Sequence, residues 1–191
     1  MTKSGMIVAA ALATVAVAAC RKAEPARPAP SAAPTSSRSS SSAAPAAPSA
    51  PAFSHNPTLE VFGYYLPAQQ VVAGAYRLRN ISLGSEEDFR NWEANKRLSS
   101  YAPVMLEFED SAGGGDGLRV LPDRYAVGDQ GVTFEGRDPK LGAVSFHGRF
   151  DAHGFAAARR GDAPQAVVLI GEVKAAGKTF PETRFTWFGG D

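Results

Sequence analysis

The stretch Val144-Ser145-Phe146-His147-Gly148 decides the fold class of this chain. Its apolar residues occupy every second position, a pattern that is typical of a β-strand with one buried face. Val132-Thr133-Phe134-Glu135-Gly136 and Val167-Val168-Leu169-Ile170-Gly171 repeat the same form, which is Val, any residue, a large apolar residue, any residue and Gly. Each glycine predicts a bend, a bulge or the close packing of a neighbouring strand. The C-terminal half is therefore expected to form a sheet.

Short apolar runs broken by turn residues extend from Pro57 to the end of the chain. The segment 104–109 alternates in period two, and the glycine-rich segment 113–117 then turns the chain. Phe185 and Trp187 predict a last strand that finishes in the core. We count about eight strands with turn signals between them. The fold is therefore predicted to be mainly β, an antiparallel sandwich or barrel.

One short helix is expected near 85–98. Ser85-Glu86-Glu87-Asp88 resembles a capping box, with Asp in the position that Glu usually takes. Phe89 and Trp92 stand three residues apart, so both are predicted to face the sheet.

Composition divides the chain into a leader, a tether and one folded part. Every Phe, Tyr and Trp stands at Phe53 or later, so residues 53–191 are predicted to be a single globular β-rich domain. The net charge is +1, and no segment combines clustered basic residues with aromatics. We therefore expect no nucleic-acid partner. The one cysteine, Cys20, cannot form a disulfide within the chain.

Residues 1–19 have the features of an export signal. Lys3 supplies a positive start, and Met6 to Ala19 is apolar or small apart from Thr14. A helix of about fourteen residues spans roughly 21 Å, short of the ~30 Å hydrocarbon core, so a transmembrane helix is the weaker interpretation.

Val17-Ala18-Ala19-Cys20 ends this run and resembles the lipobox of bacterial lipoproteins. The resemblance implies signal-peptidase cleavage between Ala19 and Cys20 and a diacylglycerol thioether on Cys20. It also implies an acylated amine, typically palmitate, and chains of this kind anchor a protein stably when two or more are present. Arg21 follows the cysteine where Asp would favour inner-membrane retention, so the outer membrane, facing the periplasm, is preferred. The alternative is ordinary secretion, with cleavage after Ala18.

Residues 20–52 are predicted to be a disordered tether. The segment is nearly all Ala, Pro and Ser, without an aromatic residue before position 53. Such a segment buries too little apolar surface to offset its ordering entropy. It would span roughly 30 Å as a coil and approach about 100 Å as polyproline. Its basic residues offer an alternative role in contacting peptidoglycan or anionic headgroups.

His147, Arg149, Asp151 and His153 stand at alternate positions and would share one face of a straight strand. Two imidazoles and a carboxylate make a plausible metal set. The polar face of an amphipathic strand is the preferred interpretation, because Gly154 is expected to end the strand. Other candidates are weaker still. The spacing of Asp116, Asp123 and Asp129 does not match that of a calcium-binding loop, and the glycine-rich segment is not followed by the Lys-Ser/Thr and helix of a phosphate-binding loop. The sequence shows no substrate groove beside Glu107 and Glu109, and His55 stands in no catalytic motif.

Aromatic residues gather in the first half of the predicted domain, where a barrel could use them to line a cavity for an apolar or sugar-like ligand. A core role is preferred, because a domain of this size needs several aromatics inside. The residues concerned are Tyr64, Tyr65, Tyr76, Phe89, Trp92 and Tyr101.

We assign no catalytic, cofactor-binding or metal-ligating residue. The leading hypothesis is a membrane-anchored envelope lipoprotein that works as a non-enzymatic interaction or accessory module. Its partners would be the membrane, through the lipid on Cys20, and an envelope protein or the cell wall. The alternatives are a small-ligand carrier or sensor with a β-barrel pocket, and an envelope hydrolase.

Overall fold

The computed structural model describes residues 51–190. The predicted signal peptide, Cys20 and nearly all of the predicted tether lie outside the described residues. The prediction of a mainly β fold is confirmed, since strands make up most of the ordered elements. No helix among residues 51–190 is long and apolar enough to span a bilayer.

Eleven strands and two helices form within the described part of the chain. Three of the strands have only two or three residues, too few to show an alternating pattern, which explains why the sequence indicated about eight strands. The strands are β1 (Phe53–His55), β2 (Gly63–Pro67), β3 (Val72–Ala73), β4 (Tyr76–Leu83), β5 (Val104–Asp110), β6 (Leu118–Val120), β7 (Pro122–Gly128), β8 (Gly131–Asp138), β9 (Gly142–Phe150), β10 (Leu169–Ala175) and β11 (Lys178–Phe188). The helices are α1 (Glu86–Glu93) and α2 (Ala152–Arg159).

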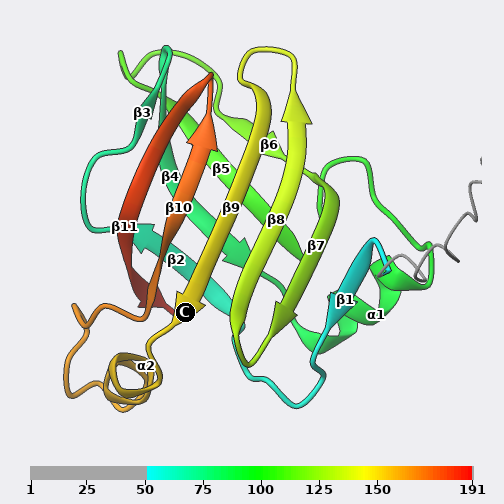
Figure 1. Ribbon diagram of the computed structural model, residues 1–191, viewed down its shortest axis with the longest axis vertical. Coiled ribbons are helices and arrows are strands. Elements are labelled where there is room, and N and C mark those ends of the chain that lie inside the picture. Colours follow the sequence, from blue (N-terminus) through cyan, green and yellow to red (C-terminus); the bar gives the residue numbers. More distant parts are fainter. Residues whose placement is uncertain (1–50, 191) are drawn as a thin grey trace, which may run out of the picture. The chain divides into compact units, whose positions relative to one another are not determined.

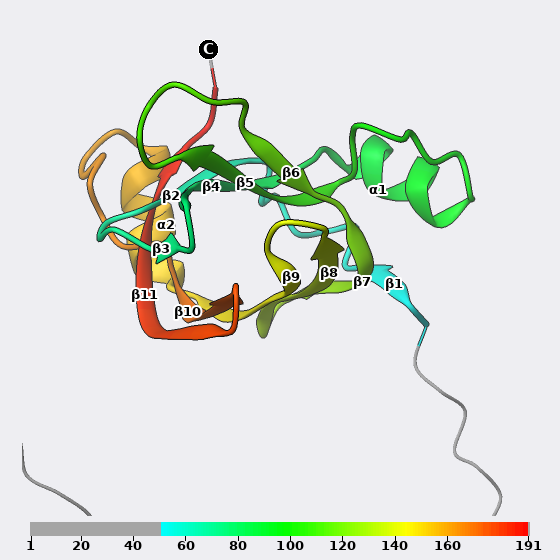
Figure 2. The ribbon, with the colours of Figure 1, turned by 90° about the horizontal axis from the view of Figure 1, so that it is seen from above.

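All the strands belong to one curled sheet that forms a half-barrel (Figures 1 and 2). Its order is β1-β7-β8-β9-β10-β11-β2-β4-β5-β6, with β3 paired to β4 beside this path. Every pairing is antiparallel except that of β1 with β7. The curl brings the two ends of this order together, so that β5 contacts β7 and β6 contacts β8.

Glycines in the repeated Val-containing motif make room for aromatic rings. Gly148 of β9 is paired with Gly171 of β10. A Cβ on Gly148 would meet the ring of Phe146, and a Cβ on Gly171 would lie 2.7 Å from Cε2 of the same ring. The ring of Phe146 therefore lies over both glycines. This confirms the predicted close packing.

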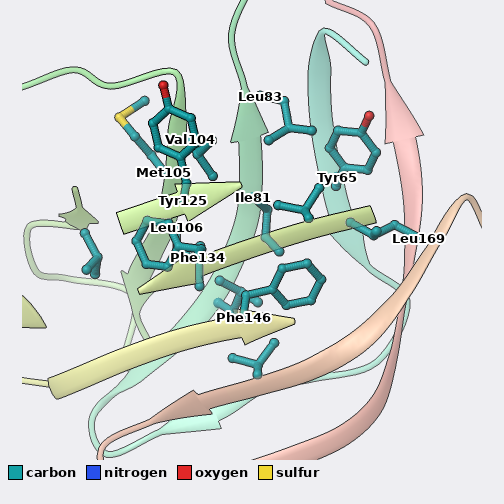
Figure 3. Close-up of a cluster of buried hydrophobic side chains, with 14 of the residues drawn as sticks. Tyr65, Ile81, Leu83, Val104, Met105, Leu106, Tyr125, Phe134, Phe146 and Leu169 are labelled. Atoms are coloured by element: carbon teal, nitrogen blue, oxygen red, sulfur yellow. The ribbon is translucent and has the colours of Figure 1, made fainter. Parts of the chain in front are cut away.

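The concave side of the sheet is filled by side chains from opposite strands, as Figure 3 shows. Tyr65, Ile81, Leu106 and Phe134 are all at most 1% exposed. Phe146 packs edge to face against Phe185, with 5.5 Å between ring centroids. The half-barrel therefore encloses a packed core, whose burial from water is the main stabilising contribution to the fold.

Helix α1 confirms the predicted capping box. The Ser85 side chain accepts a hydrogen bond from the backbone N–H of Asp88, and the Asp88 carboxylate accepts one from the backbone N–H of Ser85. Phe89 and Trp92 are buried, as predicted. The predicted end near residue 98 is wrong. The helix stops at Glu93 because Asn95 takes a left-handed conformation with φ 64°, a common way for a helix to end.

Helix α2 was not predicted. The strand ends at Phe150, and Asp151 becomes the N-cap, with its side chain accepting from the backbone N–H of Gly154. Phe155 then lies parallel to Tyr65, with ring centroids 6.4 Å apart and an interplanar angle of 3°. This contact seats α2 against the concave side of the sheet.

Candidate functional site

The convex side of β2 and β11 carries an exposed apolar patch, which we call the outer aromatic surface. It consists of Phe62, Tyr64, Leu66 and Phe188, which are 52%, 40%, 40% and 48% exposed. The alternation of β2 points Tyr65 into the core and its neighbours outward. Contiguous exposed apolar groups mark interaction sites more often than scattered ones.

Strand pairing holds the members of this surface together. Tyr64 is paired with Phe188 across β2 and β11, and their rings stack with centroids 6.4 Å apart. The indole Nε1 of Trp187 donates to the carbonyl of Phe62 at 3.0 Å, which fixes the chain just before β2. The surface is therefore built on paired strands, and its rings have defined positions.

A small groove adjoins the outer aromatic surface on the side of β4 and β5. It has a volume of 170 Å³ and is lined by Phe62, Tyr64, Ser82, Tyr101, Met105, Glu107 and Arg119, among others. Tyr64 is paired with Ser82 on β4, and Ser82 with Met105 on β5. One end of the groove is therefore aromatic and the other is polar.

The polar end holds a carboxylate between two partners. Glu107 accepts from Nδ2 of Asn80 at 3.4 Å and lies 3.3 Å from Nε of Arg119. Its side chain is only 15% exposed, whereas that of Arg119 is 60% exposed. The arrangement presents hydrogen-bond acceptors and donors beside the tyrosine ring.

Two polar atoms near the groove are buried and have no hydrogen-bond partner among the described residues. They are Oγ of Ser82 and Oδ1 of Asn80, in residues that are 7% and 5% exposed. Most buried polar groups in proteins are hydrogen-bonded, so such atoms call for an explanation.

Tyr101 closes the groove on the side of α1. Burial raises the pKa of its phenol, and the Asp88 carboxylate, with which the phenol forms a hydrogen bond, raises the pKa further. Tyr101 therefore stays protonated beyond the ordinary titration range of a phenol, and its O–H donates a hydrogen bond to the Asp88 carboxylate. The capping residue of α1 and the wall of the groove are linked through this bond.

A larger pocket of 530 Å³ lies where the β1–β2 connection meets the start of α1. Its lining includes His55, Glu60, Ser85, Phe89 and Arg159. Nη2 of Arg159 lies 2.6 Å from Oε2 of Glu60, so α2 is joined to the β1–β2 connection at the pocket wall. The volume falls within the roughly 300–1,000 Å³ range that is typical of small-ligand sites.

His55 is the one buried imidazole on that wall. Its Nδ1 lies 2.9 Å from Oε1 of Glu93, and the phenol of Tyr125 donates to the same oxygen at 3.1 Å. A carboxylate only accepts hydrogen bonds, so Nδ1 carries the proton. Nε2 is buried and without a partner among the described residues. Burial and the Glu93 carboxylate both raise the pKa of Tyr125.

The alternating polar set of the C-terminal half does not come together. His147 and Arg149 lie on β9, but Asp151 caps α2 and His153 lies in its first turn. Within residues 51–190, no group of three or more His, Cys, Asp or Glu side chains lies close enough to hold a metal ion.

The remaining sequence candidates serve the sheet or its turns. Glu109 pairs with Arg77 at 2.7 Å, and Asp123 lies 3.9 Å from Arg137. Asp116 lines a hollow of 690 Å³ beside β5 and β6. Asp129 accepts from Asn56 at 3.0 Å.

Most of the aromatic residues that were weighed as cavity-lining belong to the core. Tyr65, Phe89 and Trp92 are buried, and Tyr76 and Tyr101 are half-buried and pack against the same core. Tyr64 alone of this set is strongly exposed. The sequence analysis did not identify the exposed neighbours of Tyr64. A signal was present, because Phe62, Tyr64 and Leu66 stand at alternate positions and make the outward face of β2 apolar.

The chain matches no protein-family model, no curated protein and no solved structure in the three comparisons made.

Proposed function

We propose that this chain is a lipid-anchored protein of the bacterial cell envelope, in which the β-rich domain is a non-enzymatic interaction module. The observation that carries the proposal is the outer aromatic surface. Its apolar side chains are exposed to solvent on one side of the sheet. The other side of the sheet packs against the hydrophobic core. Solvent-exposed aromatic groups in a paired, ordered position are suited to contact a partner.

The anchor part of the proposal rests on the sequence pattern Val17-Ala18-Ala19-Cys20 and on the composition of residues 20–52. Lipid on Cys20 would hold the domain at the membrane, facing the periplasm from the outer membrane, and the tether would let it reach partners some tens of ångströms away. Mass spectrometry of the mature protein tests this part. We expect an N-terminal Cys20 with acyl mass, and an unmodified start at Ala19 would contradict it.

Site-specific photo-crosslinking in cells tests the interaction module. A photo-reactive residue replaces Phe188 at one end of β11, and the control replaces exposed Lys178 at the other end of the same strand. We expect an envelope protein or cell-wall material to be captured at position 188 and not at position 178. Equal capture at both positions, or capture at neither, would count against the proposal.

A second candidate function is that of a small-ligand carrier or sensor. It is supported by the 530 Å³ pocket, whose lining includes His55 and Phe89. Thermal-shift measurements with envelope lipids and metabolites, repeated on His55→Phe, distinguish the two functions. Stabilisation of the wild type that His55→Phe abolishes would favour the carrier.

A further inference from the structure

We propose that the groove beside Tyr64 binds a saccharide, and that this saccharide is the glycan of the cell wall. The inference rests on the proposed function and names the partner of the outer aromatic surface. It is carried by two features that line the same groove: an exposed tyrosine ring and a carboxylate–guanidinium pair.

The aromatic end suits the apolar face of a sugar ring. A pyranose with equatorial hydroxyls presents C–H groups on each face, and the negative face of an aromatic ring attracts their weakly positive hydrogens. Tyr64 is 40% exposed and is supported from one side by the stacked ring of Phe188. Its ring is therefore a platform on which one sugar residue can lie.

The polar end suits the hydroxyls of the same sugar. Glu107 and Arg119 line this end of the groove, with 15% and 60% of their side chains exposed. Glu107 supplies an acceptor and Arg119 supplies donors. Sugar hydroxyls both donate and accept, so they can bridge the charged pair.

The size of the groove indicates how much of the ligand it holds. Its 170 Å³ is small beside the roughly 300–1,000 Å³ of sites that enclose a whole small molecule. It therefore suits one residue of a longer chain. The adjoining side chains of Leu66 and Phe188 remain open for the next residues of that chain.

Other macromolecules fit this site less well. A membrane surface would bring lipid against Glu107 and Arg119, and moving charged groups out of water is costly. Nucleic acid would require a basic surface, whereas Asp88 and Glu107 lie at the groove.

The binding experiment uses the full lipidated chain in a mild detergent. It is incubated with purified peptidoglycan sacculi, with a soluble chitin oligosaccharide and, separately, with phosphatidylglycerol vesicles. We expect co-sedimentation with sacculi and chemical-shift or calorimetric evidence of oligosaccharide binding. Vesicle binding through the lipid on Cys20 is expected whatever the groove binds, so the absence of both sacculus retention and oligosaccharide binding is the result that would overturn the inference.

Four variants connect binding to the groove. Tyr64→Ala is expected to weaken oligosaccharide binding about tenfold, whereas Tyr64→Phe retains most of it. Glu107→Gln is expected to weaken binding about threefold to tenfold, because it removes the charge of the acceptor at the polar end of the groove. Leu98→Ala, at an apolar residue that is 62% exposed and does not line the groove, is the control. Equal affinity of Tyr64→Ala and the control would contradict the assignment.

The photo-crosslinking result separates this inference from the proposed function. Capture of an envelope protein at position 188, with no retention by sacculi and no oligosaccharide binding, would leave the interaction module standing and refute the saccharide. Absence of both crosslinking and saccharide binding would refute both.

Discussion

Nδ1 of His55 lies 2.9 Å from Oε1 of Glu93, and this contact joins β1 to the last residue of α1. The imidazole also lies flat against Phe89, with ring centroids 4.7 Å apart and an interplanar angle of 12°. Phe53, two residues before His55, packs on Trp92 and Tyr125. β1 is therefore held to α1 by a polar contact enclosed within aromatic packing.

Glu93→Ala should lower the free energy of unfolding by about 1–3 kcal/mol, because Nδ1 of His55 and the Tyr125 phenol both lose their acceptor. Urea unfolding measures the change. The matched control is Glu87→Ala in the same helix, whose exposed side chain should matter by only a few tenths of a kcal/mol. Equal losses for the two variants would mean that the contact between His55 and Glu93 does not stabilise the fold.

Alkaline pH should destabilise the domain. Burial is the main cause that raises the pKa of Tyr65, Tyr101 and Tyr125 above the ordinary value of 10.0. As pH rises past that value, the unfolded chain releases these protons before the folded chain does, so the unfolded state gains stability. The free energy of unfolding should therefore be unaffected by these groups below about pH 10 and fall above it.

Urea unfolding across this pH range checks the direction of the effect. Tyr101→Phe removes one titrating group at the groove, so the loss of stability above pH 10 should become shallower in this variant than in the wild type. An unchanged slope would show that Tyr101 does not contribute to the alkaline transition.

The pairing of Gly171 with Gly148 should be intolerant of side chains. A Cβ at Gly171 would meet Cα of Gly148 and the backbone carbonyl of His147, so β9 or β10 would have to move. Gly171→Ala should cost about 1–3 kcal/mol, the usual range for overpacking. Gly128→Ala in β7, where a Cβ would meet nothing within 4 Å, is the control. A difference in unfolding midpoint is expected between the two, and its absence would argue against the tight approach of the strands.

The sequence predicted the sheet well where apolar and polar residues alternate because one face of a strand is buried and the other is exposed. On β8 and β9 the apolar residues of the repeated motif face the core, and the pattern led to the correct faces. Ser85 and Asp88 predicted the start of α1 for a similar reason, because capping depends on residues close together in the chain. The end of α1 depended on Asn95, and the prediction did not use the tendency of asparagine to take the left-handed conformation that ends a helix.

The candidate sites were harder to predict because they depend on residues that are distant in the chain. Ser82 meets Tyr64 and Arg119 only through the pairing of β2, β4, β5 and β6. His55 and Glu93 are 38 positions apart, and neither stands in a motif. The prediction that the alternating polar residues ending at His153 share one face was wrong because it relied on residues close together in the chain. It assumed a straight strand, and a helix capped by Asp151 replaced the end of that strand.

The packed interior of the half-barrel makes a last prediction, which bears on the carrier alternative. Phe146 is 1% exposed and lies over Gly148 and Gly171, which have no side chains to fill its space. Phe146→Ala should therefore leave a cavity and cost about 3–5 kcal/mol in urea unfolding. Phe188→Ala, at a ring that is 48% exposed, is the control and should cost much less.

The same pair of variants tests whether the interior is filled. Benzene should raise the unfolding midpoint of Phe146→Ala, because an apolar cavity of this kind stays dry and accepts apolar guests. It should not raise the midpoint of the wild type or of Phe188→Ala. Stabilisation of the wild type by benzene would show that the interior has room for a ligand, and the carrier would then become the stronger of the two functions.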